Sequence, residues 1–126
     1  MDRRFSDAHK GIALIGVYGE DCARIVTVNR ALADLLAATP EDLVGSSICE
    51  RIHAADRNRA VDELLRLIGG AASCEAEGRM LANDGRVRWV RVFAALLPPG
   101  DIARPLAMLH FAHIAERDEQ PRDPAG

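Results

Sequence analysis

The chain has 126 residues with 16 basic and 19 acidic side chains, which gives a formal net charge of −3. This length suits a single domain with one core, and the weakly acidic balance disfavours a nucleic-acid partner. Hydrophobic residues make up 48% of the chain but aromatic ones only 4%, so we expect an aliphatic core. No stretch approaches the roughly 20 apolar residues of a membrane helix, so we expect no membrane contact within this chain.

The three cysteines are Cys22, Cys49 and Cys74. Their spacing fits neither a disulfide framework nor a C-x-x-C motif. The first ten residues also lack the apolar stretch of an export signal. We therefore expect reduced thiols and a cytoplasmic protein.

The first half of the chain predicts a hairpin followed by short helices. Ile12 to Tyr18 and Arg24 to Val28 are β-rich runs that only a few turn residues separate. Asn29 is a predicted N-cap, because apolar residues at helical spacing follow it. Thr39 and the proline after it predict a second short helix that ends at Gly45.

The second half predicts a long helix and three strands. Asp56 is the predicted N-cap of a helix that runs to Ile68, where two glycines stop it. A strand is expected from Cys74 onward, then a turn at Asn83-Asp84-Gly85 and a strand over Val87 to Leu97. After Pro98-Pro99-Gly100-Asp101, a last strand is predicted over Pro105 to Ile114.

Several segments in this order resemble the PAS domain family: I-V-T-V-N-R-A-L, I-H-A-A-D, N-D-G-R-V-R-W-V and the closing H-I-A-E-R. The resemblance implies an α+β fold, a five-stranded antiparallel sheet with helices inserted after the second strand and packed on one face. It places the domain at residues 11–117, between an N-terminal cap segment (1–10) and a polar tail or linker (118–126). The sequence departs from the family at Ala54, where proline is common, and at His113 and Ala115, where the family has aspartate and threonine.

The resemblance supports neither of the family's two large cofactors. Flavin-binding members carry a reactive cysteine at the position that Ile48 holds here, and Cys49 comes one residue too late. Heme-binding members place an axial histidine at the position of Ala60. Flavin and heme are therefore disfavoured, and a small apolar ligand is the remaining expectation.

Cys49, His53 and Asp56 are the candidate catalytic or metal-binding residues of this sequence. Their i, i+4, i+7 spacing on a continuous helix would gather a thiol, an imidazole and a carboxylate for a nucleophile or half a zinc site. We expect the segment to break between His53 and Asp56, however, which separates the three groups. The sequence therefore predicts no catalytic residue, no metal ligand and no enzyme.

Two further groups have ordinary explanations. His110 and His113 lie three apart in a predicted strand, so their side chains point to opposite faces and cannot share a metal. Arginines flank Trp89, but a single tryptophan in a net acidic chain favours solvated arginines at 86, 88 and 91 over a nucleic-acid platform.

The family resemblance implies a sensory or signal-relay module of bacterial signal transduction. A small ligand would lie between the sheet and the helices, and few polar residues favour an apolar molecule such as an acyl chain, or no ligand. The predicted pocket residues are Leu14, Val26, Leu35, Ile48, Val61, Leu65, Trp89, Phe93, Met108 and His110. Both faces of the strand Val87 to Leu97 are partly apolar, so the sequence leaves open which one points inward.

The alternative hypothesis is a protein-interaction domain without a ligand. Apolar residues on both faces of the last two strands indicate that the outer face is covered. We expect a homodimer through Val90, Val92, Leu109 and Phe111. An output domain such as a histidine kinase or a diguanylate cyclase would lie in a longer parent chain.

Overall fold

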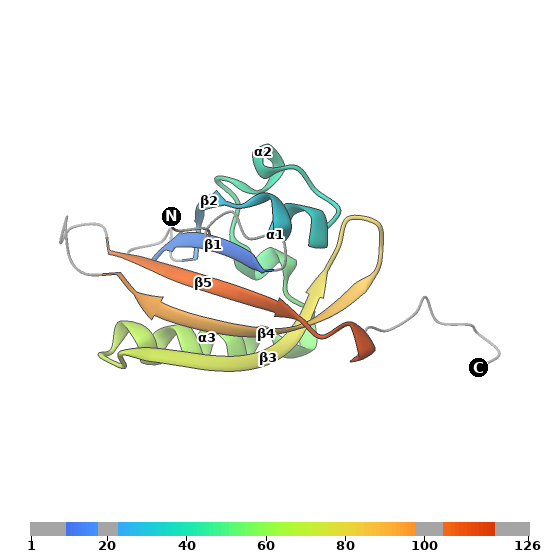
Figure 1. Ribbon diagram of the computed structural model, residues 1–126. Helices are drawn as coiled ribbons and strands as arrows, with labels where there is room; N and C mark the ends of the chain where they lie inside the picture. The colour runs from blue at the N-terminus through green and yellow to red at the C-terminus, as the bar shows by residue number, and fades with distance from the viewer. Residues whose placement is uncertain (1–9, 18–22, 98–104, 118–126) are drawn as a thin grey trace.

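The structure is a computed structural model that describes residues 10–17, 23–97 and 105–117 (Figure 1). The predictions for Tyr18, Cys22, 98–101 and the two terminal segments fall outside these residues, wholly or in large part. The described strands are β1 (Gly11–Gly16), β2 (Ile25–Val28), β3 (Ser73–Leu81), β4 (Val87–Leu96) and β5 (Leu106–His113). The helices are α1 (Arg30–Leu35), α2 (Pro40–Leu43) and α3 (Ala54–Ile68), with the short turns η2 (Ile48–Arg51) and η3 (Ala115–Arg117).

The strands form one antiparallel sheet in the order β2-β1-β5-β4-β3. The predicted fold class is confirmed, because the helices between β2 and β3 lie on one face of this sheet, with α3 alongside β3 and β4 (Figure 1). Strands β2 and β3 are the two edges. Since consecutive strand residues point to opposite faces, the register fixes which side chains share a face.

The inner face is the face that the helices cover. A Cβ atom placed on Gly11 would lie 3.0 Å from Cβ of Leu32 in α1, so Gly11 belongs to it, and Ala13 follows on the same side. Ala13 pairs with Leu109 of β5, and Leu109 pairs with Ala94 of β4. The inner-face residues of the central strands and the apolar side of the helices form the main core, namely Ala13, Ile15, Val90, Ala94, Ala107, Leu109 and Phe111 with Leu32, Leu36, Leu43, Ile48 and Leu67.

Asn29 is the N-cap of α1, as predicted. Its Oδ1 accepts hydrogen bonds from the backbone N–H of Leu32 at 3.0 Å and of Ile12 at 2.9 Å. Its side-chain amide donates to the carbonyl of Lys10 at 2.9 Å. One buried amide therefore starts the helix and joins it to β1.

The short helix α2 and the β3–β4 turn also follow the sequence. Thr39 and Asp42 form a reciprocal capping box around Pro40, although the helix ends at Leu43 and thus before Gly45. Gly85 has a φ of +88°, a conformation that glycine adopts without steric cost. The predicted hairpin turn is confirmed.

The start of α3 differs from the prediction. His53 is the N-cap, and its Nδ1 accepts a hydrogen bond from the N–H of Ala55 at 3.1 Å. Asp56 is the third residue of the helix, which frees its carboxylate for contacts outside the helix. The end at Ile68, capped by Gly69, agrees with the prediction.

Among the described residues, no helix is long and apolar enough to cross a membrane.

Candidate functional site: an apolar cavity under α3

A cavity of about 110 Å³ lies between α3 and the inner face of the sheet. Its walls are mostly aliphatic and come from η2, α3 and the four strands β1, β3, β4 and β5. The lining residues include Ile15, Ile48, Cys49, Ala60, Leu64, Leu67, Cys74, Ala76, Gly78, Met80, Val90, Val92, Ala94, Leu109 and Phe111. Small residues stand on facing walls, namely Ala60 on α3 and Ala76, Gly78 and Ala94 on the sheet, and this leaves the space open.

Of the pocket residues predicted from the sequence, only Ile48 lines the cavity. Phe93 pairs with His110 across β4 and β5, and Leu14 pairs with Met108 across β1 and β5. These positions alternate with the inner ones, so these four side chains lie on the outer face, as does Trp89. Placing them in the pocket was therefore wrong.

The sequence leaves the inward face of β4 open for a physical reason: both alternating sets of this strand are largely apolar. Arg91 has the same parity as Trp89 and Phe93, and it pairs with Glu77 of β3, so this set faces solvent. The inner set also contains an arginine, Arg88, which pairs with Met80, so the arginines do not identify the outer face from the sequence alone.

The remaining predicted pocket residues lie away from the cavity. Val61 and Leu65 point away from the sheet, and Leu65 is 58% exposed. Val26 is exposed on the edge strand β2, and Leu35 packs against the core outside the cavity. Because one helix residue corresponds to a rotation of about 100°, turning α3 by one position exchanges Leu65 for Leu64 at the cavity.

The residues predicted to form the dimer face lie on the other side of the sheet from that prediction. Val90, Val92, Leu109 and Phe111 all line the cavity and lie on the inner face. Covered by α3, they are not available to a second copy of the chain. The covering of these residues that the sequence indicated is therefore intramolecular.

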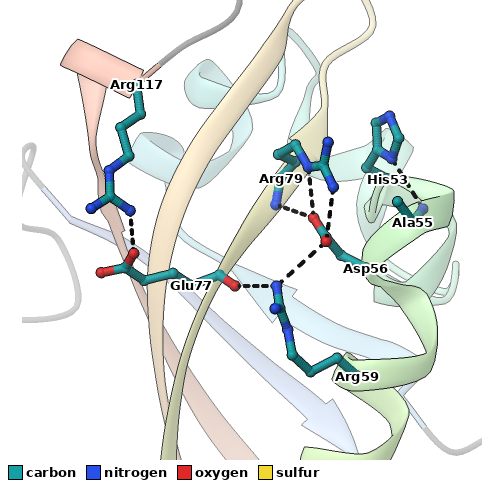
Figure 2. Close-up of polar contacts among 7 residues, drawn as sticks. All are labelled: His53, Ala55, Asp56, Arg59, Glu77, Arg79 and Arg117. Carbon is teal, nitrogen blue, oxygen red and sulfur yellow. Dashed lines mark hydrogen bonds and ion pairs between the residues drawn. The ribbon is translucent and has the colours of Figure 1, made fainter.

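Asp56 and Arg79 hold the start of α3 against the edge strand β3 (Figure 2). The Asp56 carboxylate accepts from Arg79 three times: from the backbone N–H at 2.9 Å, from Nε at 2.9 Å and from Nη2 at 3.0 Å. The Asp56 side chain is only 8% exposed and that of Arg79 only 22%. The hydrogen bonds from Arg79 lower the pKa of Asp56 below its ordinary value, so the carboxylate is charged at neutral pH.

Glu77 carries a second set of contacts at the same edge (Figure 2). Its carboxylate accepts from Arg91 at 2.7 and 3.1 Å and from Arg117 of η3, and these two guanidinium groups lower the pKa of Glu77. Its backbone carbonyl accepts from Nη2 of Arg59 at 2.7 Å. The carboxylates of Asp56 and Glu77, which belong to the lining of the cavity, are therefore each paired with arginines.

The candidate catalytic residues have structural roles. His53 caps α3, Asp56 binds Arg79, and Cys49 lies in η2, separated from α3 by the extended residue Ile52 that bridges to Met80. The segment is thus broken as predicted, although the break comes before His53 and not between His53 and Asp56. The other cavity cysteine, Cys74, is half-buried, and this burial raises the pKa of its thiol. The described residues contain no cluster of histidine, cysteine and acidic groups that could hold a metal ion.

Sheet order, the helices between β2 and β3, and a cavity beneath α3 define a PAS-type sensor fold. The PAS fold family matches residues 25–112, which is well over half of the chain. The chain belongs to the PAS family. No curated protein sequence gives a match.

Solved structures agree on the fold. The PAS domain of a protein from Colwellia psychrerythraea is similar with a TM-score of 0.77 and 16% identity, covering 91% of this chain and 94% of that one. A domain of a sensory box sensor histidine kinase/response regulator from Geobacter sulfurreducens gives 0.69 and 21%, covering 86% of each chain. The PAS domain of a LuxR-family transcriptional regulator from Burkholderia thailandensis, complexed with ethanol, gives 0.68 and 19%, covering 91% and 99%.

Proposed function

We propose that this chain is a non-enzymatic sensory module of a signal-transduction protein and that its cavity binds a small, neutral, apolar molecule. The observation that carries the proposal is the cavity under α3, whose walls are mostly aliphatic. The charged side chains at its rim are engaged elsewhere: Asp56 by Arg79, and Glu77 by Arg91 and Arg117. A ligand with its own charge would have to displace one of these pairs.

The volume limits the ligand more narrowly than the sequence did. An apolar cavity of about 150 Å³ in another protein stays dry and binds benzene or xenon. The present cavity, at about 110 Å³, is smaller, which favours a molecule about as large as benzene over an acyl chain. The relative from Burkholderia thailandensis, which is complexed with ethanol, supports small ligands for this fold.

The test is a pair of measurements on the intact chain. Native mass spectrometry of freshly purified protein detects any retained small molecule and gives its mass. Titration with dissolved xenon, followed by ¹H–¹⁵N NMR, should shift the amides of Val92 and Ala94 at the cavity. Unchanged amide positions under xenon pressure would refute the apolar-cavity proposal.

Matched variants give the control. Ala94→Val fills the cavity and should weaken xenon binding, whereas Ala95→Val places the same groups on the outer face of the same strand and should leave binding intact. Equal binding by both variants would show that xenon lies elsewhere.

A second candidate function, homodimerisation, is favoured by the outer face of the sheet. Phe93 is 44% exposed there and makes an edge contact with His110, with 6.4 Å between ring centroids. Sedimentation equilibrium should show a dimer in the wild type and a monomer in Phe93→Arg, while Val61→Arg on the exposed side of α3 serves as the control. A monomeric wild type would refute this function.

The biological setting follows from the same proposal. Relatives of this fold come from a sensor histidine kinase/response regulator and a transcriptional regulator. We place the chain in the cytoplasm of a bacterium, ahead of or beside an output domain such as a histidine kinase or a diguanylate cyclase. The half-buried thiols of Cys49 and Cys74 are consistent with a reducing compartment.

A further inference from the structure

Six residues form a closed ring of contacts around the edge strand β3, which we call the edge ring. Its members are Asp56 and Arg59 of α3, Glu77 and Arg79 of β3, Trp89 of β4 and Arg117 of η3. Five of them are drawn in Figure 2. The edge ring starts at the wall of the cavity, because Asp56, Arg59, Glu77 and Arg79 all belong to its lining.

Two routes in the edge ring lead from α3 to η3. Asp56 binds Arg79, whose guanidinium lies 5.2 Å from the centre of the Trp89 ring, and the guanidinium of Arg117 lies 6.0 Å from the same ring. Along the other route, Arg59 donates to the carbonyl of Glu77, and the carboxylate of Glu77 accepts from Arg117. The contact between Arg59 and Asp56, at 3.4 Å, closes the ring at α3.

The edge ring passes from one face of the sheet to the other. Gly78 lies on the inner face, where a Cβ atom would be 3.6 Å from Oδ2 of Asp56. Arg79 and Glu77, its neighbours in β3, therefore direct their side chains from the outer face, where Arg79 pairs with Trp89. The contacts of Arg79 and Arg59 thus reach around the edge of β3 and connect the helix face to the outer face.

The turn η3 has only three residues. The N–H of Ile114 donates to the carbonyl of Trp89 at 2.8 Å, and the N–H of Arg117 donates to the carbonyl of Ile114 at 3.0 Å. The side chain of Arg117 adds the contacts to Glu77 and Trp89. Exposed ion pairs contribute little one at a time, but here each partner of Arg117 is itself positioned by a residue or backbone contact that leads to α3.

We propose that the edge ring couples the position of α3 to the order of η3, so that a shift of the cavity wall changes how the chain leaves the domain. Displacing α3 from β3 separates Asp56 from Arg79 and Arg59 from Glu77. Both groups that contact Arg117 then lose a constraint. Coupling of this kind is reciprocal, so a restraint on η3 also favours one position of α3. The proposal does not require a bound ligand.

A matched pair of arginines tests the coupling. Arg59 and Arg66 are both exposed residues of α3, with side chains 57% and 66% exposed, and each forms an ion pair with an acid three residues earlier. Arg59 also donates a hydrogen bond to β3, to the carbonyl of Glu77. Arg59→Met and Arg66→Met therefore remove similar groups, and only the first opens the edge ring.

The readout is amide hydrogen exchange of Ile114, measured by ¹H–¹⁵N NMR relative to Ile15 in β1. Arg59→Met should raise the exchange of Ile114 about fivefold over that of Ile15, as a local opening does, and Asp56→Asn should raise it at least as much. Arg66→Met should leave the ratio unchanged. The emission of Trp89, the single tryptophan, should shift in Asp56→Asn because Arg79 loses its anchor.

Two results would overturn the proposal. One is an unchanged ratio of Ile114 to Ile15 exchange in Arg59→Met. Because Arg59 is exposed, this variant should fold even if Asp56→Asn does not. The other is an equal rise in Arg66→Met, because the effect would then be a general loosening of α3. Neither result bears on xenon binding by the cavity, so this proposal and the ligand-binding proposal fail independently.

Discussion

Replacing Asp56 with alanine tests the contact that orients α3. The substitution removes the acceptor for three hydrogen bonds from Arg79 and leaves that guanidinium, whose side chain is 22% exposed, without its carboxylate. Breaking a buried ion pair costs roughly 3–5 kcal/mol. The remaining exposure of Arg79 and its contact with Trp89 reduce this, so we expect a loss of about 2–4 kcal/mol in the free energy of unfolding.

Urea denaturation followed by Trp89 fluorescence measures this loss. Asp62→Ala is the control, because Asp62 is an exposed residue of the same helix, and its replacement should change stability by less than about 0.5 kcal/mol. A loss no larger in Asp56→Ala than in Asp62→Ala would refute the view that this ion pair sets the position of α3.

The same contact predicts a pH dependence. The pKa of Asp56 is lowered in the folded chain, chiefly by the hydrogen bonds from Arg79. The stabilisation is therefore fully present above the unfolded pKa of about 3.9 and is lost as the pH falls through the lower folded value. The stability gap between wild type and Asp56→Ala should be constant from pH 5 to 7 and shrink below about pH 4. A gap that grows on acidification would contradict the assignment.

Three further substitutions have defined outcomes in thermal or urea unfolding. Ala94→Val should stabilise the protein by up to about 1.5 kcal/mol relative to Ala95→Val, because two added carbons fill the cavity; equal stabilities would mean that the cavity is not empty space. Ala37 has a φ of +53° after α1, so Ala37→Gly should add roughly 1 kcal/mol, and a loss would refute that geometry. Asn29→Ala should cost about 2–3 kcal/mol, since it leaves the buried N–H groups of Ile12 and Leu32 without their acceptor; a cost under about 1 kcal/mol would contradict this.

Local chemistry made the elements of this fold predictable. Asn29 can cap a helix because its side chain accepts from the backbone three residues on, and Thr39 does the same before Pro40. Gly85 permits the turn between β3 and β4 because it adopts a positive φ. Each of these signals acts over a few residues, so the sequence alone indicates which elements form and roughly where, and the order of these elements carried the resemblance to the PAS family.

The cap of α3 shows how a local signal can mislead. Both His53 and Asp56 have side chains that can accept from a helix N-terminus, and the sequence favours the carboxylate. In the structure Arg79, which is 23 residues away in the chain, takes the carboxylate and leaves the cap to the imidazole. A competition between a local and a distant partner is settled only when both are in place.

The sequence by itself determined the strands and the helices, because capping, turn conformation and apolar periodicity are properties of neighbouring residues, and the family resemblance implied the class of fold. Only the tertiary structure decided which residues line the cavity. Both alternating sets of β4 are apolar, so the inward face depends on contacts between elements, where Glu77 pairs with Arg91 outside and α3 covers Val92 inside. The rotation of α3 likewise depends on Asp56 meeting Arg79, and it places Leu64 and not Leu65 at the cavity.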